Sequence, residues 1–344
     1  MSLRLSSVQR RLGAITFGLV AVAAAFLLGL RFGRRSSVTV TEGKFPEELV
    51  YVRSTDDIVS GGAMFTASRA ARKPLAVIWI HGWGANFYAP TYTVIARELA
   101  ARGLTTIVGN TRMHDIGNVA GYRFGRRIRG GGYWGVASEE VRDLAAWADF
   151  AEHQGFGRFV LVGHSAGWAA VRAYQANRQD PRVAGLVLAS GAVSPDPRPP
   201  DPQQLADAKR MMAEGNADDL VRIRNRGFPS FISAATFMDI VNTPPEFRDF
   251  FGIKTANPGV ARIHCPLLAF FGTAGDVGNE SELELLKSSI ARQRSGPSSV
   301  AAVMIHNADH MYTGEEAQVA ETITGWAASL LFPSPTNGRV SGKR

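Results

Sequence analysis

The chain contains one cysteine in 344 residues. A single thiol cannot form an intramolecular disulfide, so a disulfide-built scaffold is excluded and cysteine usage does not reveal the redox compartment. Cys265 precedes Pro266 at the start of an apolar run. We therefore expect Cys265 to be a small buried hydrophobic residue.

Metal-ligand spacing and internal repeats are also absent from the sequence. The seven histidines do not form a pattern typical of a metal site, so no metal and no cofactor are predicted. The composition is otherwise that of an ordinary globular protein, with 45% hydrophobic and 20% charged residues. A chain of this length fits one α/β domain with an inserted cap.

Acidic residues are scarce at the two ends of the chain. Residues 1–44 carry a net charge of +6 and residues 339–344 one of +3, which leaves residues 45–338 at −1 out of the total of +8. The basic excess therefore belongs to the ends and not to the globular body. This distribution argues against nucleic acid as a partner.

Residues 12–30 form an uncharged apolar run with arginines on both sides. The run is long enough to cross a bilayer as a helix. Arginines follow it where a cleaved signal peptide would have a small-residue site. We therefore expect residues 1–35 to be a membrane-spanning signal anchor with the globular part outside the cytoplasmic membrane; secretion after signal cleavage is the alternative. Residues 36–46 are predicted to be a linker and residues 333–344 a disordered tail.

Short apolar runs alternate with amphipathic segments between these ends. The continuous apolar run 75–80 is typical of a strand buried on both faces, whereas 139–152 has helical periodicity. Further strands are expected at 49–53, 62–67, 105–109, 159–162, 183–190, 267–271 and 300–305, and further helices at 92–101, 166–177, 281–292 and 315–331. The alternation predicts an α/β fold with a mostly parallel central sheet and helices on both faces.

Four motifs follow strands of this predicted sheet. The sequence GHSAG at 163–167 turns from a strand into a helix, with Ser165 at the turn and the Ala166 N–H at a helix N-terminus. The other motifs are HGWG at 81–84, FGTAGD at 271–276 and NADHMY at 307–312. Functional sites of such sheets lie at the carboxyl ends of the strands, so we expect the four motifs to meet there.

Together the motifs resemble the α/β-hydrolase superfamily, in particular its serine esterases and lipase-like hydrolases, over residues 47–332. The resemblance implies the α/β-hydrolase fold. It also implies that Ser165 attacks an acyl carbonyl, that His310 transfers the proton and that Asp276 orients the histidine.

The same resemblance implies an oxyanion hole formed by the backbone N–H groups of Trp83 and Ala166. Glycines in the first loop would let the backbone approach the substrate. The candidates for contact with the substrate are His81, Gly82 and His164.

Two members of the implied triad have competitors. Asp276 stands one residue further from its strand than is usual in the family, so Glu280 and Asp196 remain alternative acids. His306 is the alternative histidine, but it lies at the edge of its strand. His310 is favoured because it lies in the loop beyond the strand and ahead of the final helix.

Two stretches bear on the substrate. Residues 191–262 interrupt the alternation and resemble the helical cap, or lid, of this family, with a helix starting at Asp201-Pro202. Their apolar residues either pack as a small core or line a pocket for an apolar, uncharged acyl group. Residues 112–135 are predicted to be a long loop whose arginines form a solvated face or recognise an anion or lipid headgroups. These arginines are Arg123, Arg126, Arg127 and Arg129.

The sequence therefore predicts a hydrolase that cleaves a small-molecule carboxylic ester through an acyl-enzyme. One alternative is another acyl-transfer activity, namely that of a thioesterase, an amidase or a cofactor-free peroxidase-like enzyme. The other is a catalytically silent hydrolase fold that serves as a binding module. Neither the substrate nor the oligomeric state follows from the sequence.

Overall fold

The computed structural model describes residues 47–123, 126–196, 198–223 and 231–331. The predicted anchor, linker and tail lie outside the described residues. Within the described ranges, no helix is both long enough and apolar enough to cross a membrane.

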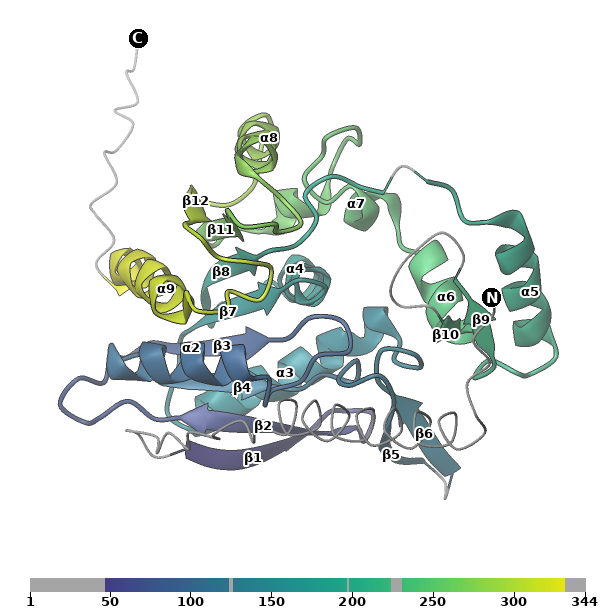
Figure 1. Ribbon diagram of the computed structural model, residues 1–344, viewed down its shortest axis with the longest axis horizontal. Coiled ribbons are helices and arrows are strands. Elements are labelled where there is room, and N and C mark those ends of the chain that lie inside the picture. The colour runs from purple at the N-terminus through teal and green to yellow at the C-terminus, as the bar shows by residue number, and fades with distance from the viewer. Residues whose placement is uncertain (1–46, 124–125, 197, 224–230, 332–344) are drawn as a thin grey trace, which may run out of the picture. The chain divides into compact units, whose positions relative to one another are not determined.

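An eight-stranded sheet lies between two layers of helices (Figure 1). Its strands, in spatial order, are β1 (Glu47–Arg53), β2 (Val59–Phe65), β4 (Thr106–Gly109), β3 (Ala76–Ile80), β7 (Phe159–His164), β8 (Val183–Ala189), β11 (Leu267–Gly272) and β12 (Val300–Ile305). The pairs β1–β2 and β2–β4 are antiparallel, and every pair from β4 to β12 is parallel. The predicted mostly parallel sheet is confirmed, and the predicted ends of its strands lie within about three residues of those observed.

Alternate residues of the central strands pack into separate cores on the two faces of the sheet. Val77 and Trp79 contact the core of α2 (Pro90–Ala101) and α9 (Glu316–Leu331). Ile78 and Ile80 contact the core on the opposite face. That face is covered by α3 (Glu140–His153), α4 (Gly167–Arg178) and α8 (Glu280–Ala291). Burial on both faces explains why these strands are continuous apolar runs in the sequence.

The insert at 191–262, which we call the cap, is not purely helical. It contains α5 (Pro202–Ala213), the antiparallel pair β9 (Leu220–Arg222) and β10 (Phe231–Ser233), α6 (Ala234–Val241), α7 (Pro245–Arg248) and the 3-10 helix η2 (Gly259–Arg262). As predicted, α5 begins at Pro202, and the Asp201 side chain accepts a hydrogen bond from the Gln204 N–H.

Two groups of apolar cap residues belong to different cores. Ile232 and Phe237 belong to a small core of the cap, whereas Phe250 and Phe251 are buried in the main core beside α4. Both groups therefore stabilise packing. The strand pair was not predicted from the sequence, because three-residue strands are too short to show period-two alternation.

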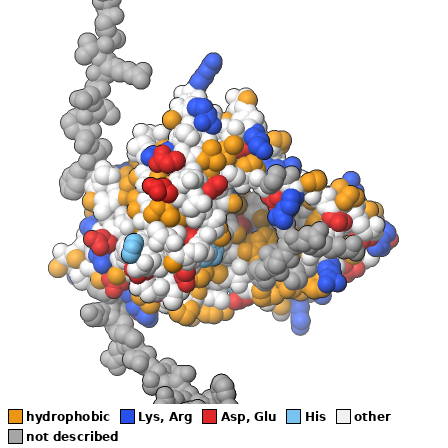
Figure 2. Space-filling view, turned by 45° about the horizontal axis from the view of Figure 1, so that its top comes forward, with side chains coloured by type: hydrophobic (Ala, Val, Ile, Leu, Met, Phe, Trp, Pro, Cys, Tyr) orange, Lys and Arg blue, Asp and Glu red, His pale blue; other side chains and the backbone are white. Residues whose placement is uncertain are grey.

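The predicted loop at 112–135 is wrong in part. It contains an antiparallel hairpin of β5 (Asn118–Arg123) and β6 (Arg126–Gly130), followed by the 3-10 helix η1 (Ala137–Glu139). The hairpin is separate from the central sheet and rich in glycine and arginine, so no apolar run marks it in the sequence. The Arg127 and Arg129 side chains are exposed. Figure 2 shows basic and acidic side chains interspersed on the face that it draws, in keeping with the nearly neutral body.

Candidate active site

Ser165 occupies the sharp turn between β7 and α4. Its φ of 53° lies in the left-handed region, which is strained for a residue with a Cβ, and its N–H donates to the Ala189 carbonyl at 2.8 Å. The flanking glycines leave room for the turn. A Cβ on Gly167 would lie 2.6 Å from the His81 carbonyl oxygen, and a Cβ on Gly163 would collide with the backbone of Gly167.

His310 connects Ser165 with Asp276. The His310 Nε2 atom lies 3.1 Å from the Ser165 Oγ atom, and Nδ1 lies 2.8 Å from Asp276 Oδ1. Asp276 comes from the loop after β11 and His310 from the loop after β12, so the ends of three strands on the same side of the sheet, β7, β11 and β12, provide the three side chains. Since a carboxylate only accepts, Nδ1 carries the proton and Nε2 is free to accept one from the serine.

The Asp276 carboxylate is fully buried and hydrogen-bonded on both oxygens. Oδ2 accepts from the Ser190 hydroxyl and from the Gly272 N–H at 2.7 Å, while Oδ1 accepts from the Val277 N–H at 2.6 Å as well as from His310. Burial alone would raise the pKa of Asp276. The hydrogen bonds outweigh burial and hold that pKa below its usual value, so the carboxylate is charged.

Ser190 and Tyr312 are supporting residues that the sequence analysis did not identify. Both are buried, and the Tyr312 hydroxyl lies 2.5 Å from Ser190 Oγ. Because Ser190 donates to Asp276, the tyrosine hydroxyl donates to the serine. Gly275, with a φ of 80°, forms the turn that brings Asp276 to the histidine from one position further along the chain. Tyr312 is the last residue of the NADHMY motif, and its place in that motif is the feature of the sequence from which a role near His310 could have been predicted.

The alternative acids and the alternative histidine lie in other surroundings. Glu280 is exposed at the start of α8. Asp196 pairs with Arg198 at 2.9 Å. His306 is exposed, and its backbone N–H donates to Gln318 at 2.7 Å. The structure therefore brings Asp276 and His310 to Ser165.

The HGWG loop and the elbow each contain one backbone N–H group of the predicted oxyanion hole. Among the described residues, no acceptor is found for the N–H of Trp83 or for that of Ala166. Gly82 lies against the elbow, since a Cβ there would stand 2.8 Å from Ser165 Cβ. Both donors therefore belong to loops that contact the serine, and they suit an oxyanion formed at this point.

His81, a candidate for substrate contact, lies in the interior. Its Nδ1 donates to the Gly82 carbonyl at 2.7 Å, and its Nε2 accepts from the Thr111 N–H at 3.1 Å. Burial lowers the pKa of His81 to about 4, so the ring is neutral near pH 7. With both nitrogens engaged, the ring positions the loop that contains Gly82 instead of facing a substrate.

His164, the second such candidate, is also buried. Its Nε2 donates to the His310 carbonyl at 2.8 Å, and its Nδ1 accepts from the Tyr92 hydroxyl at 2.7 Å. The same hydroxyl accepts from the Gly82 N–H at 3.3 Å. Burial lowers the pKa of His164 to about 3. Through Tyr92, the neutral His164 ring thus connects the loop that contains Gly82 with the loop that contains His310.

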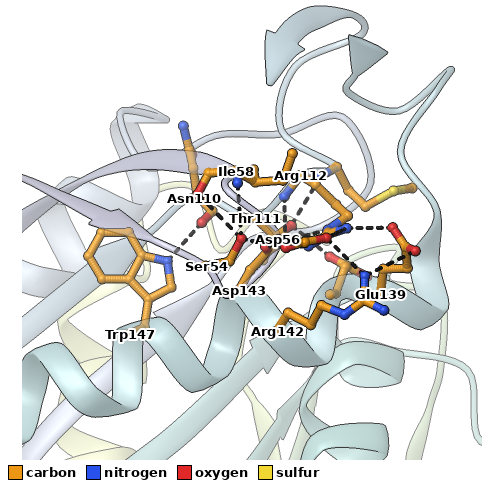
Figure 3. A network of polar contacts seen from close by, with 12 residues as sticks. Ser54, Asp56, Ile58, Asn110, Thr111, Arg112, Glu139, Arg142, Asp143 and Trp147 are labelled. Atoms are coloured by element: carbon orange, nitrogen blue, oxygen red, sulfur yellow. Dashed lines mark hydrogen bonds and ion pairs between the residues drawn. The ribbon is translucent and has the colours of Figure 1, made fainter. Parts of the chain in front are cut away.

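A partly buried network of ion pairs surrounds Arg112, the residue after Thr111 (Figure 3). The Arg112 side chain pairs with Asp143 and Asp56 at 2.9 Å and with Glu139 at 2.5 Å. Burial alone would lower the pKa of Arg112, but these carboxylates raise it. The network ties the loop after β4, which includes Thr111, to α3 and to the β1–β2 turn.

Within the described ranges, no group of three or more His, Cys, Asp or Glu side chains is placed to hold a metal ion. Cys265 is a free, half-buried thiol, and burial raises its pKa to about 12. A thiol of that kind is protonated near pH 7 and is a poor nucleophile.

Comparison with known proteins identifies the family. The model of the alpha/beta hydrolase family matches residues 77–322, which is most of the chain. No curated protein matches the chain in sequence.

Similar solved structures include Est1E from Butyrivibrio proteoclasticus, with 14% identity, a TM-score of 0.54, and 82% of this chain and 98% of that chain covered. DcsB in complex with a substrate analogue has 13% identity, a TM-score of 0.60, and 83% and 99% coverage. The esterase domain of a Rhodothermus marinus protein has 17% identity, a TM-score of 0.50, and 82% and 98% coverage. These structures share the fold, and the family match shows that the chain belongs to the alpha/beta hydrolase family and is a hydrolase.

Proposed function

We propose that the protein is a carboxylic-ester hydrolase that works through an acyl-enzyme on Ser165. The observation that supports this most directly is the pair of hydrogen bonds by which His310 connects Ser165 to the buried Asp276 carboxylate. This is the arrangement of nucleophile, base and orienting acid that acyl transfer requires.

In the proposed reaction, Ser165 Oγ attacks the ester carbonyl carbon and its proton passes to His310 Nε2. The N–H groups of Trp83 and Ala166 donate to the resulting oxyanion. Asp276 stabilises the imidazolium and does not take its proton.

Collapse of the tetrahedral intermediate breaks the bond to the alcohol. The alkoxide leaves with the proton from His310, and the acyl group stays on Ser165. Water then attacks the acyl-enzyme, gives a proton to His310 and releases the carboxylic acid as the serine regains its proton.

An ester is favoured as substrate because of two of the structures that are similar in fold. The first is an esterase domain, and the second, Est1E, has been solved with ferulic acid bound. Ferulic acid is a carboxylic acid, the kind of product that ester hydrolysis releases. We propose a small-molecule ester with an apolar acyl group, since the partly buried Trp83 of the loop after β3 packs against the apolar core of the cap.

Labelling with a serine-directed fluorophosphonate tests the nucleophile. The native protein should be labelled and Ser165→Ala should not be. Equal labelling of both proteins, or no labelling of the native protein, would contradict the proposal and favour a binding module. A panel of p-nitrophenyl esters graded by acyl length then tests the substrate class, with thioester and anilide analogues of the best ester as comparison.

We further propose that residues 1–35 anchor the enzyme in the cytoplasmic membrane with the hydrolase domain outside. The support is the uncharged run at 12–30 and its arginine flanks.

A further inference from the structure

A cavity lies between α4 and the cap, and none of the triad residues lines it. Its volume is about 380 Å³, which is within the range of small-molecule sites. It is lined by one stripe of α4, by the start of η1 and by the segment from α6 to α7. The lining residues are Ala137, Ser138, Ala169, Arg172, Ala173, Asn177, Asp239, Ile240, Asn242, Thr243, Pro244 and Phe247.

Arg172 is the cation of this cavity. Its Nε donates to the Trp168 carbonyl at 3.2 Å, and its guanidinium carbon lies 4.7 Å from the centre of the Phe250 ring and 5.5 Å from that of Phe251. The guanidinium therefore packs on an aromatic floor that comes from the main core.

Among the described residues, no carboxylate forms an ion pair with Arg172. In contrast, Arg112 and Arg182, two other partly buried arginines, each pair with several carboxylates. The terminal nitrogens of Arg172 have no acceptor among the described residues, yet neither is sealed from solvent. Those N–H groups are therefore open to a ligand in the cavity.

The acidic residue of the same cavity does not neutralise Arg172. Asp239 accepts from the Ser138 N–H at 3.0 Å and from the Ser138 hydroxyl at 2.5 Å, which ties α6 of the cap to η1. Burial lowers the pKa of Arg172 to about 10, so the side chain is still charged near pH 7. A partly desolvated cation without a paired anion is costly, and a bound anion would relieve that cost.

We propose that this cavity binds a small monocarboxylate with an apolar body, held by a paired hydrogen bond to Arg172. A planar guanidinium matches the two oxygens of a carboxylate. The alanine, isoleucine and phenylalanine lining suits an apolar body. A phosphate dianion is disfavoured relative to a monocarboxylate, because its two charges cost more to desolvate and Asp239 would repel them more strongly than a single charge. Binding here needs none of the proposed chemistry at Ser165.

Calorimetric titration of the full-length Ser165→Ala protein with benzoate tests the proposal, because this variant separates binding from hydrolysis. We expect one benzoate per chain, at least tenfold weaker binding to the additional variant Arg172→Met, and little binding of the neutral benzamide. Arg178→Met is the matched control: this arginine is exposed at the end of the same helix, and benzoate should bind that variant with unchanged affinity.

Thr243→Trp gives a second test that leaves Arg172 in place, since the larger side chain would fill the cavity. The Thr243→Trp substitution should also weaken benzoate binding at least tenfold. This test does not depend on whether the Arg172→Met variant folds. The proposal is overturned if benzoate does not bind, if both Arg172→Met and Thr243→Trp bind it normally, or if benzamide binds as tightly. Displacement of benzoate by equimolar inorganic phosphate would overturn the carboxylate class.

Discussion

At the scale of single residues, the Asp276 carboxylate depends on neighbours from three strand ends. Ser190 follows β8, Gly272 ends β11, and Tyr312 lies beyond β12. Their hydrogen bonds keep the carboxylate charged in a place where water cannot reach it. The orientation of His310 therefore depends on a network and not on one residue.

Asp276→Asn should lower kcat by about three to four orders of magnitude, because an amide can neither hold the proton of His310 on Nδ1 nor stabilise the imidazolium. Steady-state kinetics on the best ester of the panel measures this loss. Glu280→Gln is the control and should retain normal kcat. Near-normal turnover by Asp276→Asn would show that another acid serves the histidine.

Glu140 should make the protein less stable as the pH rises. Its side chain is buried and accepts from the Thr111 hydroxyl at 2.6 Å, and burial raises its pKa to about 8. An unfolded glutamate has a pKa of about 4.3, so between these values the folded state binds the extra proton. Stability from this group is then present at low pH and falls by at most about 1.4 kcal/mol per pH unit between about pH 4.5 and 8.

Glu140→Gln tests this linkage, since glutamine resembles the protonated acid and still accepts from Thr111. Urea unfolding at pH 5 and pH 8 should show that the substitution reduces the loss of stability across this interval. An identical pH dependence in both proteins would show that Glu140 titrates normally.

At the scale of elements, the loop after β3 and the elbow after β7 act as one unit. Gly82 fits against Ser165, and the chain of hydrogen bonds through Tyr92 and His164 joins this loop to that of His310. These hydrogen bonds fix the positions of loops that follow different strands. The backbone N–H groups of Trp83 and Ala166 are therefore held in place relative to Ser165.

Gly82→Ala should lower kcat by about a hundredfold, because its Cβ would stand 2.8 Å from Ser165 Cβ and displace the Trp83 N–H. Fluorophosphonate labelling should slow by a similar factor. The control is Gly325→Ala in α9, where a Cβ meets nothing within 4 Å. That variant should retain activity and gain about 0.5–1 kcal/mol of stability. Unchanged kcat in Gly82→Ala would show that the loop is not part of the oxyanion site.

At the scale of the whole molecule, the charge and the hydrophobic run are concentrated at the N-terminal end, and the body is nearly neutral. If residues 1–35 are an anchor, their removal should move the enzyme from the membrane fraction to the soluble fraction without loss of kcat. Fractionation of cells that express each form, followed by the ester assay, measures both quantities. Full-length protein in the soluble fraction would contradict membrane attachment.

The sheet, its flanking helices and the elbow at Ser165 could all be predicted from the sequence. Buried strands and amphipathic helices have periodicities that a short stretch displays, and a tight turn requires glycine at stated positions. These are local properties, so the succession of strands and helices along the chain could be predicted without the tertiary structure.

Which side chains meet could not be predicted in the same way, because it depends on how distant parts of the chain pack. The sequence left Glu280 and Asp196 open as acids, and it placed His81 and His164 at the substrate. Packing turned both rings inward, and the left-handed Gly275 carried Asp276 to His310. The physical reason is that such contacts join residues up to 146 positions apart, and no local periodicity encodes a partner at that separation.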